Sequence, residues 1–283
     1  MPDLLSVSVF NSGYKPIPGG QGWDPAVQAT WPATTSTLLS GRSEAVLVDA
    51  LLTTVEGERL ASWTQASGKV VSLVVVTHGH GDHFFGAGPT LAAFPHARLV
   101  AATQDVVDDA ANQITPEYLS VWNSWFAGQF DPSPRLPTPL GGDEIEVEGH
   151  VLRVMVVGAG DGVLGTIVHV PERDLVCSGD VVYNDIHMWL WKSTNASRLA
   201  WLESIDIIAA LRPQTIIVGH RDPHAPDDDA VRVLDQSRRY IEDFDAAVAG
   251  SDSATEIMDR MMLRYPTYGN PYTLFAAAAS QVA

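Results

Sequence analysis

One short segment of the sequence concentrates side chains that bind metal ions. His78, His80, Asp82 and His83 fall within six positions, directly after the apolar run 70–76 and with glycines between them. Neutral imidazoles and a carboxylate are the ligands of Zn²⁺ and similar first-row ions. The glycines allow a tight loop without side-chain clashes. We predict that His78 and His80 point to one side of this turn and that Asp82 and His83 project elsewhere, which suits two adjacent ions.

Two more candidate ligands follow other apolar runs. Asp180 comes after the run 175–177 and a Ser-Gly pair, and His220 comes after the run 215–218 and one glycine. Each signal alone is typical of a turn, but both place a ligand at the end of an expected strand. We predict that Asp180 bridges two ions and that His220 completes the ligands of the second ion.

The elements that must position these residues are short strands and helices. Continuous apolar runs, typical of strands covered on both faces, occur at 45–48, 70–76, 151–157, 164–170, 175–177 and 215–218. Helical periodicity covers 195–211 and 228–248, and further helices are expected after Ser253 and at Asn270–Pro271. The mixture indicates a layered α/β fold. We expect a single domain over 1–283 with a C-terminal helical extension at about 225–283.

The segment at about 103–140 stands apart because it contains no strand-like run. A helix is expected to begin near Pro116 and to carry aromatic residues on one face. The segment reads either as an inserted helical pair with an ordinary core or as a lid whose aromatic side chains wall a substrate pocket. A loop after Asp180 could contribute to the same wall or simply pack on itself. The candidate wall residues are Trp122, Trp125, Phe126, His187 and Trp189.

The order of these motifs resembles the metallo-β-lactamase-fold hydrolase superfamily. Asp49 in Leu-Val-Asp-Ala, the His78–His83 element, Ser-Gly-Asp180 and Val-Gly-His220 occur in the family's order across roughly 35–224. The HxHxDH element is highly specific. The resemblance implies a four-layer αββα sandwich that holds one or two zinc ions at one edge, with iron or manganese as alternatives. It also implies that Asp49 orients a histidine ligand, although an aspartate that opens a turn would look the same.

The sequence departs from the family at one ligand. The superfamily places another histidine, commonly in Gly-His-Thr, where this chain has Ala159. His78 and His80 are therefore expected to lack a ligand, and the first ion to bind weakly or not at all. Asp161, on a glycine-flanked loop, is an alternative ligand, and water is another. The second set appears complete with Asp82, His83, Asp180 and His220.

The resemblance implies a metal-dependent hydrolase in which metal-bound hydroxide attacks a carbonyl. Asp82 would orient the nucleophile and move its proton. In the superfamily's acyl-homoserine-lactone lactonases, a tyrosine three residues after the bridging aspartate contacts the substrate carbonyl, and Tyr183 has that spacing. Tyr183 could stabilise an oxyanion or pack on the sheet edge. We expect the substrate to be an ester, lactone or related acyl compound that is neutral to apolar.

Two other functions are compatible with the same ligands. One is iron-dependent oxygen or sulfur chemistry, as in the superfamily's persulfide dioxygenases and flavo-diiron proteins, although the sequence shows no appended flavin domain. The other is a degenerate member, suggested by Ala159, that binds a ligand or structural metal without catalysis. Metal analysis distinguishes the first alternative from hydrolysis, and assays on generic esters distinguish the second.

The composition of the chain limits the classes of binding partner that we expect. The 283 residues carry a net charge of −17, which repels phosphate backbones and anionic lipids, so we expect neither a nucleic-acid nor a membrane partner. The sequence contains no signal-peptide pattern and no membrane-length apolar stretch. Its one cysteine, Cys177, forms no intramolecular disulfide. We expect a cytoplasmic protein with a small-molecule substrate, and the sequence leaves its oligomeric state open.

Overall fold

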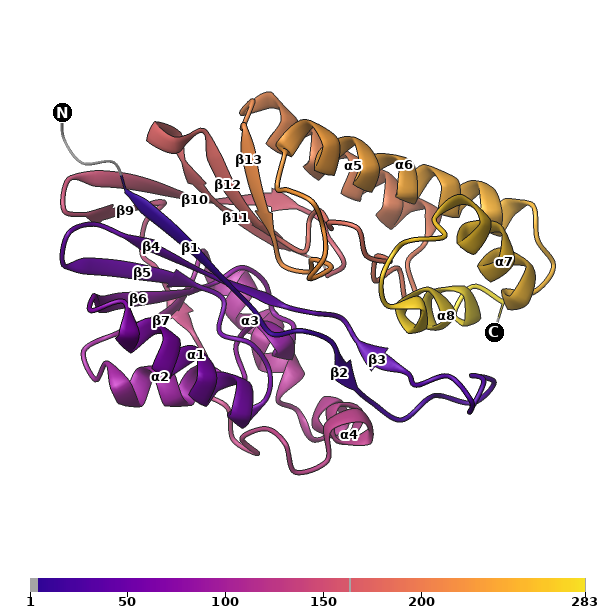
Figure 1. Cartoon of the computed structure of the whole chain (residues 1–283), viewed down its shortest axis with the longest axis horizontal. Coiled ribbons are helices and arrows are strands. Elements are labelled where there is room, and N and C mark those ends of the chain that lie inside the picture. Colours follow the sequence, from indigo (N-terminus) through magenta and orange to yellow (C-terminus); the bar gives the residue numbers. More distant parts are fainter. Residues whose placement is uncertain (1–4, 163, 283) are drawn as a thin grey trace.

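The computed structural model describes residues 5–162 and 164–282, which form two facing β-sheets with helices on both outer sides (Figure 1). The first sheet has the order β1 (Ser6–Asn11), β4 (Thr35–Ser40), β5 (Glu44–Val48), β6 (Val70–Val76), β7 (Arg98–Ala101), β8 (Thr138–Pro139). The second has the order β13 (Thr215–Val218), β12 (Leu175–Gly179), β11 (Gly165–Val170), β10 (His150–Gly158), β9 (Glu144–Val147). A separate ribbon pairs β2 (Lys15–Pro16) with β3 (Thr30–Trp31).

Helices complete the four layers, and the predicted αββα sandwich is confirmed. The first sheet is covered by α1 (Thr54–Ala66), α2 (Ala87–Ala93) and α3 (Gln104–Gln113), which is followed by α4 (Pro116–Phe126). The second sheet is covered by α5 (Asn195–Ala210) and α6 (Ala230–Ala249). The helices α7 (Ala254–Arg264) and α8 (Pro271–Ala279) pack at one end of α6 (Figure 1). Short 3₁₀ turns lie at η1 (Gly81–His83) and η2 (Pro171–Arg173).

Continuous apolar runs such as that of β12 belong to strands whose two faces pack against different cores. In β12, Leu175 and Cys177 pack between the sheets, whereas Val176 packs under the outer helices of the second sheet. Successive side chains of a strand point to opposite faces, so a strand covered on both faces must be apolar throughout. The space between the sheets is filled mainly by aliphatic side chains, among them Val48, Val100, Leu152, Val168 and Ile217.

Some elements differ from the sequence-based expectation. β4 (Thr35–Ser40) was not expected, because four of its six residues are Ser or Thr, yet every one is buried. The segment expected to be free of strands contains the short β8, which pairs in parallel with β7. Its helical part begins at Gln104, before the predicted start at Pro116. The expected helix starts after Ser253 and at Pro271 are confirmed.

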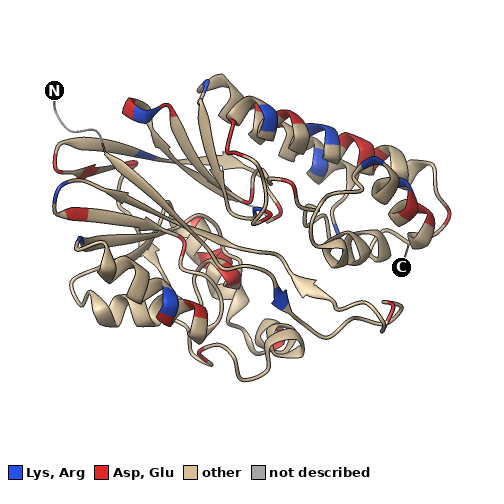
Figure 2. Cartoon of the chain, in the orientation of Figure 1, with Lys and Arg blue, Asp and Glu red and all other residues tan. Residues whose placement is uncertain are grey.

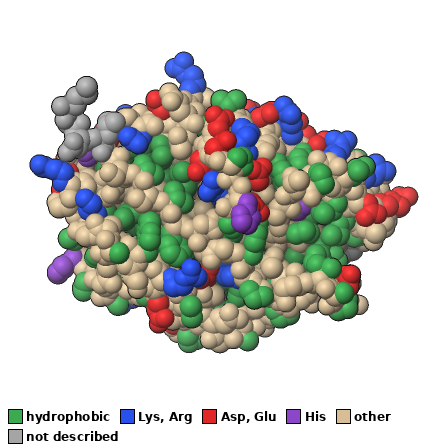
Figure 3. All heavy atoms as spheres, viewed as in Figure 1, with side chains coloured by type: hydrophobic (Ala, Val, Ile, Leu, Met, Phe, Trp, Pro, Cys, Tyr) green, Lys and Arg blue, Asp and Glu red, His purple; other side chains and the backbone are tan. Residues whose placement is uncertain are grey.

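The surface carries charged side chains of both signs. Lys and Arg alternate with Asp and Glu along α5 and α6 (Figure 2), and Arg198–Asp245 and Arg238–Asp206 ion pairs join these two helices. On the face shown in Figure 3, hydrophobic side chains gather near α7 and α8. None of the described helices is both long enough and apolar enough to cross a membrane.

The packing between the sheets gives a stability prediction. Leu152 of β10 is fully buried, whereas its neighbour Val151 is 39% exposed. Leu152→Ala should lower the free energy of unfolding by about 2–5 kcal/mol, because it leaves a cavity in the inter-sheet core. The matched Val151→Ala variant should change it by about 1 kcal/mol at most. Denaturant unfolding measures both, and equal effects would contradict this assignment of the core.

Candidate metal centre

The six predicted ligands lie together at one edge of the sandwich. Each comes from the loop that follows a strand, so the carboxyl ends of β6, β12 and β13 converge there. His220 Nε2 lies 3.4 Å from Asp82 Oδ2, although the two residues are far apart in the sequence. The loops pass closely: a side chain at Gly219 would collide with the Asp180 carboxylate and approach the His83 ring. The convergent residues are His78, His80, Asp82, His83, Asp180 and His220.

Asp180 lies between the histidines of both predicted sets. Its Oδ2 is 3.0 Å from His220 Nε2 and 3.8 Å from His78 Nε2, and its Oδ1 is 3.4 Å from His83 Nε2. Asp82, His83 and His220 present ligand atoms that lie within 4.8 Å of one another. This arrangement is compatible with the bridging position predicted for Asp180.

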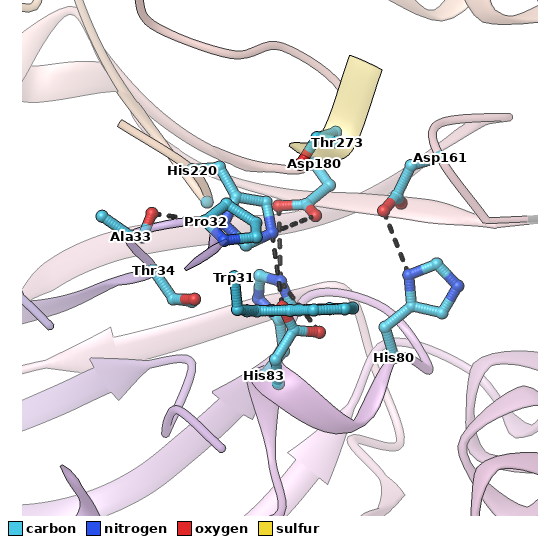
Figure 4. A network of polar contacts seen from close by, with 12 residues as sticks. Trp31, Pro32, Ala33, Thr34, His80, His83, Asp161, Asp180, His220 and Thr273 are labelled. Carbon is cyan, nitrogen blue, oxygen red and sulfur yellow. Dashed lines mark hydrogen bonds and ion pairs between the residues drawn. The ribbon is translucent and has the colours of Figure 1, made fainter. Parts of the chain in front are cut away.

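Of the alternatives open for the third ligand of His78 and His80, the structure favours Asp161. Asp161, in the loop after β10, places Oδ1 3.5 Å from His78 Nε2 and Oδ2 3.0 Å from His80 Nδ1 (Figure 4). The three residues form a group that could hold a metal ion. Ala159 instead lines a cavity and packs on the core of the second sheet. The carboxylate two residues later therefore lies within reach of both histidines.

The histidines are held by hydrogen bonds on the side away from the site. Asp49 Oδ2 lies 2.9 Å from His83 Nδ1, and its Oδ1 accepts a hydrogen bond from the Thr77 backbone N–H. His220 Nδ1 lies 3.2 Å from the carbonyl oxygen of Ala33. These contacts aim Nε2 of each imidazole inward. Asp49 thus has the orienting position that the sequence comparison implied.

Trp31 is a site residue that sequence reasoning missed. Its indole Nε1 donates a 2.8 Å hydrogen bond to Asp82 Oδ2. Trp31 belongs to the short β3, far from every motif in the sequence. The nearby pattern Trp-Pro-Ala-Thr-Thr gave no signal that a side chain there would reach Asp82.

Unpartnered polar atoms show that the site fits a metal. Among the described residues, His78 Nε2, His83 Nε2 and Asp180 Oδ1 are buried without any hydrogen-bond partner. Buried polar atoms are normally satisfied, and the exceptions call for an explanation. Three such atoms face one small volume that is rich in imidazole and carboxylate. First-row divalent ions bound among these residues would satisfy them.

The carboxylates and imidazoles shift one another's pKa values. Burial opposes the change, yet Asp161 raises the pKa of His80 to about 9, and Asp180 with Asp82 raises that of His220 to about 9. Burial lowers the pKa of His78 to about 4. The pKa of Asp180 is held well below its usual range by the imidazoles around it, His220 foremost, although burial works the other way. In the metal-free site, His80 and His220 therefore carry a proton near neutral pH.

A cavity of about 550 Å³ opens onto this site. Its wall includes His80, Asp82, Asp161 and His220, together with many indoles. The segment 103–140 contributes through α3 and α4, as a cover over the metal face would. The aromatic and helical wall residues include Trp31, Asp109, Gln113, Tyr118, Trp122, Trp125, Trp189, Trp191 and Trp201.

Three predicted pocket residues line this cavity, namely Trp122, Trp125 and Trp189. Phe126 does not, because it is fully buried behind the wall, with its ring centroid 5.7 Å from that of Trp31. His187 does not either: its Nδ1 is 2.9 Å from the Tyr240 hydroxyl, in the core beneath α6. Both assignments to the pocket wall are therefore corrected.

Tyr183 reaches the ligand residues but not the cavity. Its hydroxyl is 3.2 Å from Asp180 Oδ2 and 3.3 Å from Asp161 Oδ2, and the residue is not part of the cavity wall. Burial and the two carboxylates raise its pKa well above the usual range, so the phenol keeps its proton and donates it in a hydrogen bond. Tyr183 thus holds carboxylates in place, and the expected contact with a substrate carbonyl is not supported by this geometry.

Comparison with known proteins identifies the family. The sequence model of the metallo-beta-lactamase superfamily matches residues 29–220, more than half of the chain. This chain belongs to the metallo-beta-lactamase superfamily. A search of curated proteins finds no match.

Solved structures of the superfamily share the fold. A metallo-beta-lactamase family protein from Thermus thermophilus is 20% identical, with a TM-score of 0.65 over 96% of this chain and 91% of that one. The metallo-beta-lactamase FIM-1 from Pseudomonas aeruginosa, in its mono-zinc form, is 17% identical, with a TM-score of 0.55 over 85% of this chain and 96% of that one. At such identities the likeness shows the fold alone. The predicted membership of the superfamily is confirmed.

The raised pKa values predict that metal binding releases protons. With pKa values of about 9, His80 and His220 carry a proton near pH 7 in the metal-free protein, and an imidazolium cannot bind a metal. Metal affinity should therefore rise as the pH increases from about 6 to about 9. Isothermal titration calorimetry in buffers of different ionisation enthalpy counts the released protons. Binding heats that are independent of the buffer would contradict this prediction.

The orienting role of Asp49 can be tested separately. Asp49→Asn should weaken metal binding by about 10–100-fold, because an amide N–H₂ would face the Nδ1–H of His83. The matched control is Glu144→Gln, which changes an exposed acid paired with Arg153. Competition with a fluorescent chelator measures both affinities. If the two variants bind metal equally well, Asp49 does not position His83.

Proposed function

We propose that this protein is a metal-dependent hydrolase that opens an ester, lactone or related acyl bond of a neutral to apolar small molecule. Membership of the superfamily and the candidate metal centre support metal-dependent hydrolysis in general. The observation that carries the finer proposal is the indole-lined cavity that opens directly onto His80, Asp82, Asp161 and His220. Such a cavity can bind an apolar acyl compound with its carbonyl against the metal centre.

The proposed ligands divide into two sets around a shared residue. His78, His80 and Asp161 would hold one ion, and Asp82, His83 and His220 the other, with Asp180 between them. Zinc is the proposed metal, with iron and manganese as alternatives, since imidazole and carboxylate serve all three. When bound, such ions polarise a carbonyl and lower the pKa of water to about 7.

Asp82 is the proposed proton carrier. Although burial works against it, His83 and His220 hold the pKa of Asp82 well below its usual range, so it is a carboxylate near neutral pH. Its Oδ2 is fixed by the Trp31 N–H, and the residue lines the cavity. A fixed carboxylate at the cavity surface can orient an attacking water and accept its proton.

The indoles provide the binding surface. Trp31 lies at the centre, with ring centroids 5.3 Å from Trp122, 5.0 Å from Trp125 and 5.4 Å from Trp189. Aromatic walls bind flat or aliphatic groups through buried apolar area and exclude water from the reacting bond. Among the described residues of the wall, Lys192 is the one lysine or arginine, and its ammonium already lies over the Trp191 ring. The cavity thus offers little to a polyanionic substrate.

Hydrolysis can be tested on a panel of esters and lactones with increasing acyl size. Chelation should abolish turnover and added Zn²⁺, Mn²⁺ or Fe²⁺ should restore it, with apolar esters preferred over anionic ones. Trp125→Leu should raise KM for an aromatic acyl ester by about tenfold, equivalent to ~1.4 kcal/mol of lost binding. The matched Trp63→Leu variant changes an indole that packs on Phe10 outside the cavity, and its kcat/KM should equal the wild type. If metal-loaded, folded protein turns over none of these substrates, the proposal fails, and iron-dependent chemistry and non-catalytic binding remain as alternatives.

A further inference from the structure

The two candidate ion positions have matching donor groups. His78 and His80 stand with Asp161, and His83 and His220 stand with Asp82. Asp180 lies between them, 3.8 Å from His78 and 3.0 Å from His220. Each position therefore offers two imidazoles, one carboxylate of its own and a share of Asp180. The family pattern, with a third histidine where Ala159 stands, would make the two positions different.

We propose that Asp161 replaces the missing histidine as a metal ligand, and that the protein binds two ions of the same kind with similar affinity. This inference rests on the proposed function only in assuming that a metal binds here. It reverses the expectation from Ala159, which was a tight second ion beside a weak or absent first one. Equal donor sets should give the two ions comparable affinities.

The local structure aims Asp161 at the site. The loop closes on itself, since the Gly160 backbone N–H donates to the Gly162 carbonyl at 3.2 Å, and Asp161 lies at its tip. Its carboxylate is buried against His78 and His80. The Tyr183 hydroxyl lies 3.3 Å from Asp161 Oδ2 and 3.2 Å from Asp180 Oδ2, so the two carboxylates share the one proton that it can donate. Tyr183 is accordingly a positioning residue.

The charge of the buried ligand residues favours the binding of two ions. Asp82, Asp161 and Asp180 are all buried carboxylates, and buried charges need compensation by partners or metals. With the four imidazoles neutral, as metal ligands must be, nothing else among the ligand set offsets these charges. A single divalent ion would leave a net charge of −1 among these ligands. Two ions would leave a net charge of +1, which the Asp49 carboxylate beside His83 offsets.

The added carboxylate also affects which ion is preferred. Carboxylate oxygen suits harder ions such as Mn²⁺, whereas a third imidazole would favour Zn²⁺. Compared with a position built from three histidines, the position of His78 and His80 should therefore discriminate less strongly against Mn²⁺ or Fe²⁺. This is a difference in relative affinity, because Zn²⁺ generally binds nitrogen and oxygen ligands more tightly than Mn²⁺.

The test is a metal titration that does not depend on catalysis. Metal-free full-length protein is titrated with Co²⁺, followed by visible absorption, and with Mn²⁺, followed by electron paramagnetic resonance. Wild type should bind two ions per chain with affinities within about tenfold of each other, and two Mn²⁺ ions should give the spectrum of a coupled pair. Asp161→Asn, which keeps the shape and removes the charge, should bind one ion tightly and show an uncoupled Mn²⁺ spectrum.

Two more variants complete the design. Asp108→Asn is the matched control, because Asp108 is an exposed acid on α3 that lies outside the cavity wall and the ligand groups, and this variant should still bind two ions. The double variant Ala159→His with Asp161→Asn supplies a third imidazole, and should regain two ions with at least tenfold greater preference for Zn²⁺ over Mn²⁺. Thermal melting checks that each variant is folded.

The outcomes separate this inference from the proposed function. One tightly bound ion in wild type, or two ions that Asp161→Asn leaves unchanged, would overturn the role of Asp161 while hydrolysis could still be observed. Two equivalent ions without ester or lactone turnover would uphold the role of Asp161 and overturn the proposed function. A folded protein that binds none of these metals would refute both.

Discussion

The structure depends on burying four carboxylates, that of Asp49 included, and four imidazoles where the two sheets meet. Such a group is costly in a protein interior unless every charge has a partner. The loops after β6, β10, β12 and β13 must therefore arrive together and in register, because a displaced loop would leave a buried charge uncompensated. The inter-sheet core of aliphatic side chains supplies the rigidity that fixes these strand ends. The packing of the two sheets and the geometry of the metal centre therefore depend on each other.

The site was predictable where ligands are adjacent in the sequence or follow apolar strands. The His78–His83 element and the residues Asp180 and His220 were identified in this way, and the structure brings them together. The sandwich was predictable for the same reason, since β11 and β12 are buried on both faces. Periodicity and strand-end position are local properties, and the sequence displays them directly.

Features set by tertiary contact were not predictable. β4 is rich in Ser and Thr, yet it is buried because its neighbours β1 and β5 enclose it. Trp31 reaches Asp82 only because the β2–β3 ribbon folds over the site, and no pattern near Trp31 indicates this. Phe126 shares a helical face with Trp122, but only one of the two lines the cavity, since the helix packs at an angle that periodicity does not specify. Asp161 was one of several candidates until the loop geometry placed its carboxylate.

Through its position, Trp31 takes part both in the proposed proton transfer and in the proposed binding of the substrate. One edge of its indole holds the carboxylate proposed to move the proton, and its ring supports the indoles that would bind the substrate. A mutation that reshapes the wall to admit a larger compound would therefore shift the hydrogen bond to Asp82 as well. During evolution, substitutions in this wall that change the range of substrates would also alter the contact between Trp31 and Asp82. Those that impair the proposed proton transfer would be lost. New specificities would then arise more readily from Trp191 and Lys192, which do not contact the acid, than from the centre of the wall.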